Sequence, residues 1–419
     1  MKNDQLKILF ISADKFPPFR VDVTVLFGEE MVGRGHLIDW LLQSENPLDR
    51  TFETQWSGGK AIVGPNVIGT SILSKAKLHL LSIFHDAKMF RILKSKKYNI
   101  ILVKDKFISG LFAIVASALF NVKFVYWLSF PFPEDSFFRV KEKTVKFPLL
   151  YWLRGLFFHL LLYGIILPLC DHAFVQTEYM KSNIAKKGVS TKKMTSVPMA
   201  VSIKDIPFFG YNQKEENTKD ELAVVYLGTL IRIRRMDFLL RSFQMVLNRE
   251  KNARLYLVGG SEDPDDEKLL WREAKKLGIE HAVTITGFLP QKEAWQYVKK
   301  ANVCVSPIYP SPSFDVGSPT KLLEYMAMGK ATVANNHPEQ RAVLSESMAG
   351  ICVPYEETAF SEAILYLIKR QDIAHQMGIR GRKYIEERRN YSQTSARVEQ
   401  QFLNIVGLNL HSHSGVVWN

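Results

Sequence analysis

The stretch SFDVGSPTKLLEYMAMGKATVANN, residues 313–336, decides the fold, because it predicts a loop, a helix and a strand in turn. Asp, Gly, Ser and Pro fill the loop, apolar residues recur with helical spacing over 320–328, and small residues predict a strand over 331–335. A strand-like run, VCVSP at 303–307, precedes the loop. This order of strand, helix and strand predicts a parallel βαβ unit.

The same alternation extends over the rest of the chain. In the second half it predicts strands at 222–228, 254–259 and 283–287, with helices at 237–247, 267–276 and 292–300. In the first half it predicts strands at 7–12, 99–104, 123–128 and 172–177, with helices at 25–34, 107–120 and 178–186. The expected fold class is therefore α/β, with two Rossmann-like, doubly wound parallel sheets facing a cleft.

Domain boundaries follow from one polar stretch, YNQKEENTKD at 211–220, which has no apolar periodicity. We expect a first domain at 1–207, a linker at 208–220, a second domain at 221–387 and a terminal helix with a tail at 388–419. The opening stretch MKNDQLKILFISADKFPP is too short and too interrupted for a signal peptide.

Composition favours anionic partners in a reducing compartment. The net charge is +13, which suits nucleotide phosphates or an anionic membrane face. No basic low-complexity tail and no nucleic-acid motif occurs in the sequence, so nucleic acid is not expected as a partner. The three cysteines, Cys170, Cys304 and Cys352, lack metal-like spacing and cannot all pair, which indicates the cytoplasm.

The segment FPLLYWLRGLFFHLLLYGIILPL, residues 147–169, is nearly all apolar but is interrupted by Arg154 and His159. Only 15 residues remain from Gly155 to Leu169, fewer than the roughly 20 that span a bilayer. Four basic residues precede it, namely Arg139, Lys141, Lys143 and Lys146. The segment is either an interfacial element that contacts an anionic membrane face or a buried helix of the first domain.

Several nucleotide-binding and catalytic motifs are absent from the sequence. The loop after the first strand contains no glycine, which disfavours NAD or FAD, and no P-loop occurs. The acidic run SEDPDDEK at 261–268 could hold a divalent metal. It also precedes a predicted helix, where aspartate is a common cap, and capping is the favoured interpretation.

Two features predict an anion site at the carboxyl edge of the second sheet. The first strand there ends at Gly228 and is followed by Arg232, Arg234 and Arg235, whose guanidinium groups suit phosphate. In the loop at 313–321, Ser318 and Pro319 predict a helix cap, and the start of this helix offers free amide groups to an anion.

Glu324 lies about one and a half turns into that helix, among apolar neighbours. A surface position is disfavoured by Leu322, Leu323, Tyr325 and Met326, which flank it. A diphosphate with an attached ribose and sugar would satisfy both the helix start and the carboxylate.

Four stretches of the second half together resemble the retaining glycosyltransferases of the GT-B fold, in the bacterial family 4 group. They are YLGTLIRIRRMDFLL, LYLVGGSEDPDDEKLL, VTITGFLPQKEAWQYVKKANVCVSP and SPTKLLEYMAMGKATVANN, in the order and spacing of that family. The first half is similar in KILFIS, FPP, GRGH and VPMAV. The resemblance is greatest to the branch that builds surface polysaccharides or lipid-linked glycans.

The resemblance implies transfer of a sugar from a UDP- or GDP-sugar with retention of configuration. Arg234 matches the family lysine that grips the diphosphate, Thr229 stands at the position of the family arginine, and Arg235 or Arg232 would supply the second charge. Glu324 matches the second glutamate of the E-x7-E motif and would bind the ribose.

The same resemblance locates the sugar and the base. The first glutamate of the motif falls at Val316, so either the adjacent Asp315 takes that role or the backbone amides of Val316, Gly317 and Ser318 hold the sugar. Thr320 and Lys321 belong to the donor-binding helix start. The base would lie near Phe288 and Leu289.

Acceptor-side residues are expected at three positions. Asp22 lies in RVDV, which replaces the family's glycine pair, Ser129 stands where a histidine is common, and His337 lies at a strand end near the cleft. The helix at 388–406 resembles the family's return helix to the first domain. The resemblance implies no bound metal or other cofactor.

The expected acceptor is a glycan or a lipid-linked glycan, and the expected location is the inner face of the bacterial cytoplasmic membrane. The departures at Thr229 and Val316 support an alternative, a catalytically degenerate module that binds nucleotide-sugar or glycan within an assembly complex.

Overall fold

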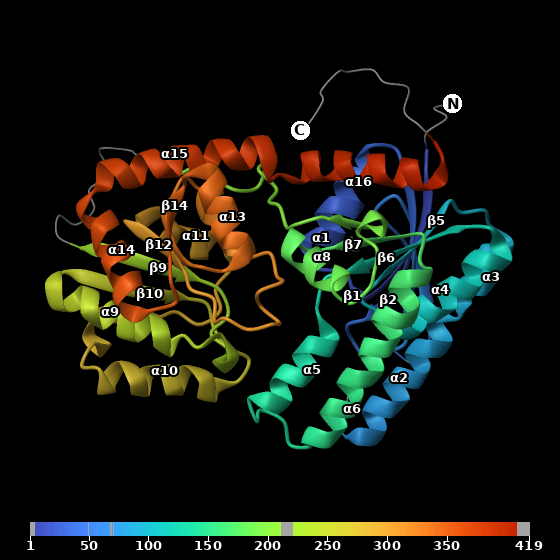
Figure 1. Ribbon diagram of the computed structural model, residues 1–419, viewed down its shortest axis with the longest axis horizontal. Helices are drawn as coiled ribbons and strands as arrows, with labels where there is room; N and C mark the ends of the chain where they lie inside the picture. Colours follow the sequence, from blue (N-terminus) through green and yellow to red (C-terminus); the bar gives the residue numbers. More distant parts are fainter. Residues whose placement is uncertain (1–4, 49, 68, 70, 211–220, 409–419) are drawn as a thin grey trace. The chain divides into compact units, whose positions relative to one another are not determined.

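The computed structural model describes residues 5–48, 50–67, 69, 71–210 and 221–408. The chain forms two compact units, Met1–Pro198 with Tyr391–Asn419 and Met199–Asn390 (Figure 1). The units therefore divide at 198/199 and at 390/391, whereas the sequence predicted boundaries at 207, 221 and 387. Residues 211–220 of the predicted linker lie outside the described residues.

Within its described residues, the first unit is built on an eight-stranded sheet with the order β3-β4-β2-β1-β5-β6-β7-β8. The strands are β1 Lys7–Phe16, β2 Leu37–Ser44, β3 Phe52–Trp56, β4 Gly59–Gly64, β5 Ile100–Lys104, β6 Lys123–Leu128, β7 His172–Val175 and β8 Met194–Ser196. All neighbours pair in parallel except β3 and β4, which form an antiparallel hairpin at the edge. The central strands are apolar runs buried along their length, as a sheet covered on both faces requires.

Helices of the first unit connect these parallel strands, except α16, which follows the second unit in the chain (Figure 1). A short α1, Val21–Val23, continues into π-helical turns at Thr24–Met31, as predicted for a helix that stops before Gly35. The others are α2 Ile72–Asp86, α3 Lys88–Ser95, α4 Phe107–Phe120, α5 Phe132–Lys141, α6 Pro148–His159, α7 Leu167–Leu169, α8 Glu178–Ala185 and α16 Tyr391–Val406.

The second unit carries a parallel sheet with the order β11-β10-β9-β12-β13-β14. Its strands are β9 Leu222–Leu227, β10 Ala253–Val258, β11 Val283–Ile285, β12 Val303–Ser306, β13 Thr332–Asn335 and β14 Gly350–Val353. Its helices are α9 Asp237–Arg249, α10 Pro264–Lys276, α11 Gln291–Lys300, α12 Thr320–Ala327, α13 Pro338–Ser347, α14 Glu357–Lys369 and α15 Gln371–Arg388. This strand order is that of a doubly wound sheet. Successive strands are added on one side of β9 up to β11 and on its other side from β12 onward, so the strand order reverses between β9 and β12.

The predicted helix at 388–406 is wrong at its start, because α15 ends at Arg388 and α16 begins at Tyr391. The backbone N–H of Arg389 donates to the carbonyl of Ile385 over 3.1 Å and closes α15. The carbonyl of Arg389 then accepts a 3.0 Å bond from the amide of Val201, so it is not available to continue a helix.

The apolar segment is one continuous helical run at Pro148–Leu169, 22 residues long, with π-helical turns at Leu160–Ile166. Only 28% of its most apolar window is buried, so the interpretation as a buried helix is wrong for most of its length. The helix is longer than the 15 uncharged residues suggested, and by length and composition alone it could cross a membrane. Core helices of soluble proteins can be equally long and apolar.

Candidate functional site

In the second unit, β9 and β10 are each followed by a glycine, and β9 borders the point where the strand order reverses. Gly228 follows β9 with φ of +150°, and its amide donates to the carbonyl of Val258 over 2.9 Å. A Cβ atom at Gly259 would lie 2.2 Å from the Gly228 carbonyl oxygen, so only glycine fits there. The carboxyl edge of β9 and β10 thus presents backbone rather than side chains, as close approach of a phosphate requires.

Lys321, in the first turn of α12, lies beside this glycine edge. Its Nζ donates to the hydroxyl of Tyr226 over 2.9 Å and lies 4.3 Å from the centre of that ring. A Cβ at Gly228 would lie 3.5 Å from Lys321 Nζ. Burial and the nearby Arg234 guanidinium lower the pKa of Lys321 well below its usual value. An anion bound here would stabilise the charged ammonium.

Arg234 is held in place by Thr229. Its Nε donates to Thr229 Oγ1 over 2.7 Å, and its Cζ lies 6.0 Å from the centre of the Phe314 ring. The hydroxyl of Thr229 thus orients the guanidinium near Lys321, and the two cations lie on the segments that follow β9 and β12. This arrangement brings together Arg234, Thr229, Gly228 and Lys321 from the predicted site.

Arg232 and Arg235 are exposed and line a neighbouring hollow of about 350 Å³ between the starts of α9 and α10. Arg235 has φ of +54°, and its Nε lies 3.4 Å from Asp237 Oδ1. The guanidinium of Arg235 also stacks near Tyr309, with Cζ 5.4 Å from the ring centre. The second cation at the glycine edge is therefore Lys321.

Glu324 is partly buried one turn beyond Lys321 on α12. Burial raises its pKa to about 7, and Lys321 acts in the opposite direction. Within the described part of the chain, no residue forms a hydrogen bond or ion pair with its carboxylate. Its two oxygens are therefore available to accept hydrogen bonds from a ligand.

The cap predicted at Ser318 is wrong. Helix α12 begins at Thr320, and Pro319 precedes it without a side-chain cap. The Ser318 hydroxyl instead accepts a 3.0 Å bond from the amide of Met199, because this loop holds the first residues of the second unit. The first-turn amides of α12 consequently have no side chain that caps them.

The loop before α12 presents a carboxylate beside a buried valine. Val316 is only 5% exposed, so its side chain packs inward. Burial raises the pKa of the neighbouring Asp315, whose amide donates to the Ser311 carbonyl over 2.8 Å. The Gly317 amide donates to Phe314 over 2.8 Å and is already used within the loop.

His337 anchors this loop from the start of α13. Its Nε2 bonds to the Phe314 carbonyl over 2.8 Å, and its Nδ1 accepts from the Gln340 amide over 3.4 Å. The ring is 2% exposed, and burial lowers its pKa. Both nitrogens are therefore engaged in holding the fold, and the carbonyl contact requires the proton on Nε2.

The residues expected near the base follow β11. Phe288 is 61% exposed and offers a flat aromatic surface, whereas Leu289 is partly buried against the core of the unit. The capping interpretation of 261–268 is confirmed, since the Asp263 side chain accepts from the Asp265 amide over 3.0 Å at the start of α10. No group of three potential metal ligands occurs among the residues that the structure describes.

In the first unit, Asp22 and Ser129 belong to one charged network at the carboxyl ends of β1, β5 and β6. Arg20 joins them, with Nε 3.1 Å from Asp22 Oδ1 and Nη2 3.5 Å from Ser129 Oγ. Lys104 Nζ lies 3.3 Å from Asp22 Oδ2 and 3.2 Å from Asp14 Oδ2. These cations lower the pKa of the buried Asp22 despite its desolvation.

Sequence reasoning missed four members of this network, namely Asp14, Arg20, Lys104 and Asp105. The Ser129 amide donates to Asp105 Oδ1 over 2.8 Å, and burial raises the pKa of Asp105. The available signal was position, because Lys104 and Asp105 end an apolar strand, where polar residues gather at a ligand edge.

Comparison with known proteins gives one family match, to part of the chain, and several similar structures. Residues 221–370 match the family model described as Glycosyl transferases group 1. A search of curated proteins gives no match. The chain is similar in structure to sucrose-phosphate synthase from Thermosynechococcus elongatus, with a TM-score of 0.72, 18% identity, and coverage of 96% of this chain and 100% of that one.

Two further solved structures are similar. HepE from Anabaena in complex with UDP-glucose gives a TM-score of 0.65 and 11% identity, covering 96% of this chain and 100% of HepE. The lipopolysaccharide outer core galactosyltransferase WaaB gives 0.59 and 16%, covering 95% and 99%. At these identities the likeness concerns the fold, and it confirms the GT-B architecture of two parallel-sheet units.

Proposed function

We propose that the chain transfers a sugar from a UDP- or GDP-sugar to a glycan or lipid-linked acceptor, because residues 221–370 match the family model described as Glycosyl transferases group 1. The observation that carries the proposal is the grouping of Arg234, Lys321 and an unpaired Glu324 around the glycine edge of β9. Two cations suit a diphosphate, and a carboxylate one turn away suits a ribose diol.

The cations stabilise the charge that develops on the leaving nucleoside diphosphate. As the bond from the sugar C1 to the phosphate oxygen breaks, Arg234 and Lys321 face the oxygen atoms that gain charge. The first-turn amides of α12 add a positive dipole end at the same place. We propose that these groups replace a divalent metal, so that activity survives chelation.

The sugar and base lie on opposite sides of this diphosphate position. Asp315 and the amide at Ser318 hold the sugar hydroxyls, and the transfer retains the anomeric configuration. The exposed ring of Phe288 stacks on the base. In the first unit, the network of Arg20, Asp22 and Ser129 orients the acceptor hydroxyl.

The acceptor belongs to cell-surface glycan synthesis at the inner face of the cytoplasmic membrane. The support is the apolar helix at Pro148–Leu169, whose exposed side chains include Leu149, Trp152, Leu153 and Phe157. Exposed Lys141, Lys143 and Lys146 precede it and would meet anionic headgroups. We therefore propose that the chain is a peripheral membrane protein.

A donor screen tests the proposed transfer. Purified protein is incubated with a panel of UDP- and GDP-sugars, with and without lipid-linked acceptors and with EDTA, and free nucleoside diphosphate is measured. Turnover that disappears in Arg234→Gln supports the site, and NMR of the product gives the anomer. Binding of a donor without turnover, with every acceptor, would instead favour the degenerate binding module.

A further inference from the structure

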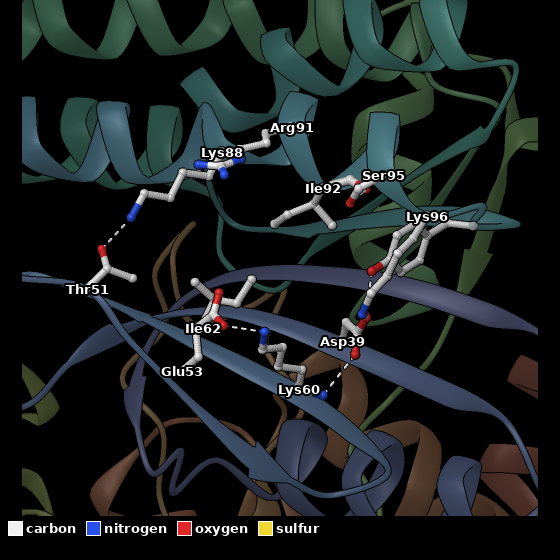
Figure 2. Close-up of a pocket in the computed structure, with 11 residues that line it drawn as sticks. Asp39, Thr51, Glu53, Lys60, Ile62, Lys88, Arg91, Ile92, Ser95 and Lys96 are labelled. Atoms are coloured by element: carbon white, nitrogen blue, oxygen red, sulfur yellow. Dashed lines mark hydrogen bonds and ion pairs between the residues drawn. The ribbon is translucent and has the colours of Figure 1, made fainter.

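A second pocket, of about 300 Å³, lies in the first unit between α3 and the strands β2, β3 and β4 (Figure 2). Asp39 and Lys60 lie near the amino ends of β2 and β4, and Tyr98 lies just before β5. The network of Arg20, Asp22 and Ser129 occupies the carboxyl ends of strands in the same sheet. The pocket therefore belongs to neither proposed substrate site.

Four cations and two carboxylates line this pocket: Lys60, Lys88, Arg91 and Lys96, with Asp39 and Glu53. Both carboxylates are already paired, since Lys96 Nζ lies 3.0 Å from Asp39 Oδ2 and Lys60 forms an ion pair with Glu53. The Tyr98 hydroxyl also donates to Asp39. Lys88 and Arg91 are therefore the two cations of the pocket that form no ion pair with either carboxylate.

Helix α3 places these two cations along one wall of the pocket through its periodicity, with Lys88 half-buried and Arg91 exposed. Met89 and Leu93 are buried, whereas Lys88, Arg91, Ile92 and Ser95 recur at helical spacing along the pocket wall (Figure 2). Like charges three residues apart on a helix repel each other. Helical periodicity alone does not require a charged residue at these pocket-lining positions of α3, where Ile92 is apolar.

Lys88 is the more constrained of the two cations. Its Nζ hydrogen-bonds to the hydroxyl of Thr51, which is neutral. Burial lowers its pKa, Glu53 partly offsets that effect, and Arg91 lowers the pKa further. In the part of the chain that the structure describes, no carboxylate lies within ion-pair distance of either Lys88 or Arg91. Among the described residues, these two adjacent cations are therefore not neutralised by an ion pair.

We propose that this pocket binds a compact phosphate-bearing anion, with Lys88 and Arg91 as its principal ligands. A guanidinium fork binds two phosphate oxygens, and the ammonium supplies a point charge to a third. The hydroxyl of Thr51 can donate to the same group while it accepts from Lys88. Ile62 and Ile92 form apolar walls around whatever carries the phosphate.

Equilibrium dialysis with radiolabelled inorganic phosphate tests the proposal on the full chain. The measurement uses an Arg234→Gln background, so that the proposed donor site contributes little. The test variant is Lys88→Gln/Arg91→Gln. The matched control is Lys94→Gln/Lys97→Gln, which removes the same charge from exposed positions that do not line the pocket.

We expect the pocket variant to bind phosphate at least about tenfold more weakly than its parent, and the control to bind it unchanged. Phosphate should also raise the melting temperature of the parent and not that of the pocket variant. Without phosphate the pocket variant should melt no lower than the parent, because a like-charge repulsion is removed. Equal loss in both variants would overturn the proposal, as would a parent that binds neither inorganic phosphate at millimolar concentration nor the vesicles of the second arm.

A second arm identifies the source of the phosphate group. The same variants are sedimented with phosphatidylcholine vesicles that contain phosphatidic acid. If the pocket variant, and not the control, loses vesicle binding, the pocket is assigned to a lipid headgroup. Loss of free-phosphate binding alone assigns it to a soluble phosphate compound. If neither ligand distinguishes the pocket variant from the control, the site does not exist.

Discussion

Arg234 donates a hydrogen bond from Nε to Oγ1 of Thr229 over 2.7 Å, so a threonine at the end of β9 orients a cation of the candidate site. From the sequence, Thr229 was a departure from the family pattern, because an arginine is usual at that position. In the structure the threonine has a role of its own. It fixes one guanidinium, and Lys321 supplies the second charge.

Thr229→Val should therefore weaken transfer without unfolding the second unit. The valine keeps the side-chain shape and removes one charge-assisted hydrogen bond, worth about 1.5–3 kcal/mol. We expect kcat/KM for the donor to fall roughly tenfold to a hundredfold. Steady-state kinetics measure the effect, and Thr229→Ser, which keeps the hydroxyl, should restore most of the activity. Equal activity of the valine variant would show that the hydrogen bond does not position Arg234 for catalysis.

Arg234→Gln should cause a larger loss, because the positive charge itself is removed from the leaving-group position. We expect turnover to fall by roughly a hundredfold or more, with the fold retained by circular dichroism. Arg232→Gln is the matched control, since Arg232 is exposed and lines the neighbouring hollow. If Arg232→Gln is the more damaging change, the diphosphate lies in that hollow and not at the glycine edge.

Glu324→Gln should stabilise the free protein above neutral pH while it weakens donor binding. The folded pKa of Glu324, about 7, lies above its usual value of 4.5. Below that usual value both states are protonated and the carboxyl has no effect on the pH dependence. As pH rises to about 7 only the unfolded state ionises, so the wild-type protein loses stability.

Glu324→Gln should thus exceed the wild type in free energy of unfolding by an amount that grows as pH rises from 4.5 to about 7 and levels off above that. Its size should be on the order of 2 kcal/mol for this partly buried group. Urea unfolding at pH 5 and pH 8 measures it. Isothermal titration with UDP and GDP at pH 8 should show at least about tenfold weaker binding. A variant that is less stable at pH 8 would indicate a structural role for the carboxylate.

The core of each sheet was predictable because buried parallel strands are continuous apolar runs. Helix α4 was predicted with its observed bounds, Phe107–Phe120. The hairpin of β3 and β4 was not predicted. The edge strand β3 is exposed or only partly buried along its length, so its sequence lacks a clear alternation of apolar and polar residues. The break at Arg389 was missed for another reason, namely that a tertiary hydrogen bond with Val201 ends the helix.

The candidate site was predictable where a motif marks it, and it was missed where only the fold brings residues together. Gly228, Arg234 and Glu324 lie in recognisable stretches, whereas Asp14 and Lys104 are 90 residues apart. The Ser318 cap was plausible locally, but the Met199 amide competes for that hydroxyl. His337 was expected near the acceptor, and its ring nitrogens instead hold the loop that contains Phe314.

The exposed helix at Pro148–Leu169 should bind anionic vesicles, and two leucines on it should account for much of the affinity. Leu149 and Leu153 are 71% and 49% exposed, one turn apart. Leu149→Gln/Leu153→Gln removes apolar area worth about 1 kcal/mol or more per residue at an interface. We expect vesicle binding to fall roughly tenfold or more in sedimentation assays.

The matched control is Ile379→Gln, which changes an apolar residue of the second unit that is also 49% exposed. Charge reversal at Lys143 and Lys146 should weaken binding to anionic vesicles and not to neutral ones, and added salt should reduce that difference. Vesicle binding that is unchanged by the leucine variant, or lost equally in Ile379→Gln, would mean that this helix does not contact the bilayer. Its exposed apolar face would then need another partner.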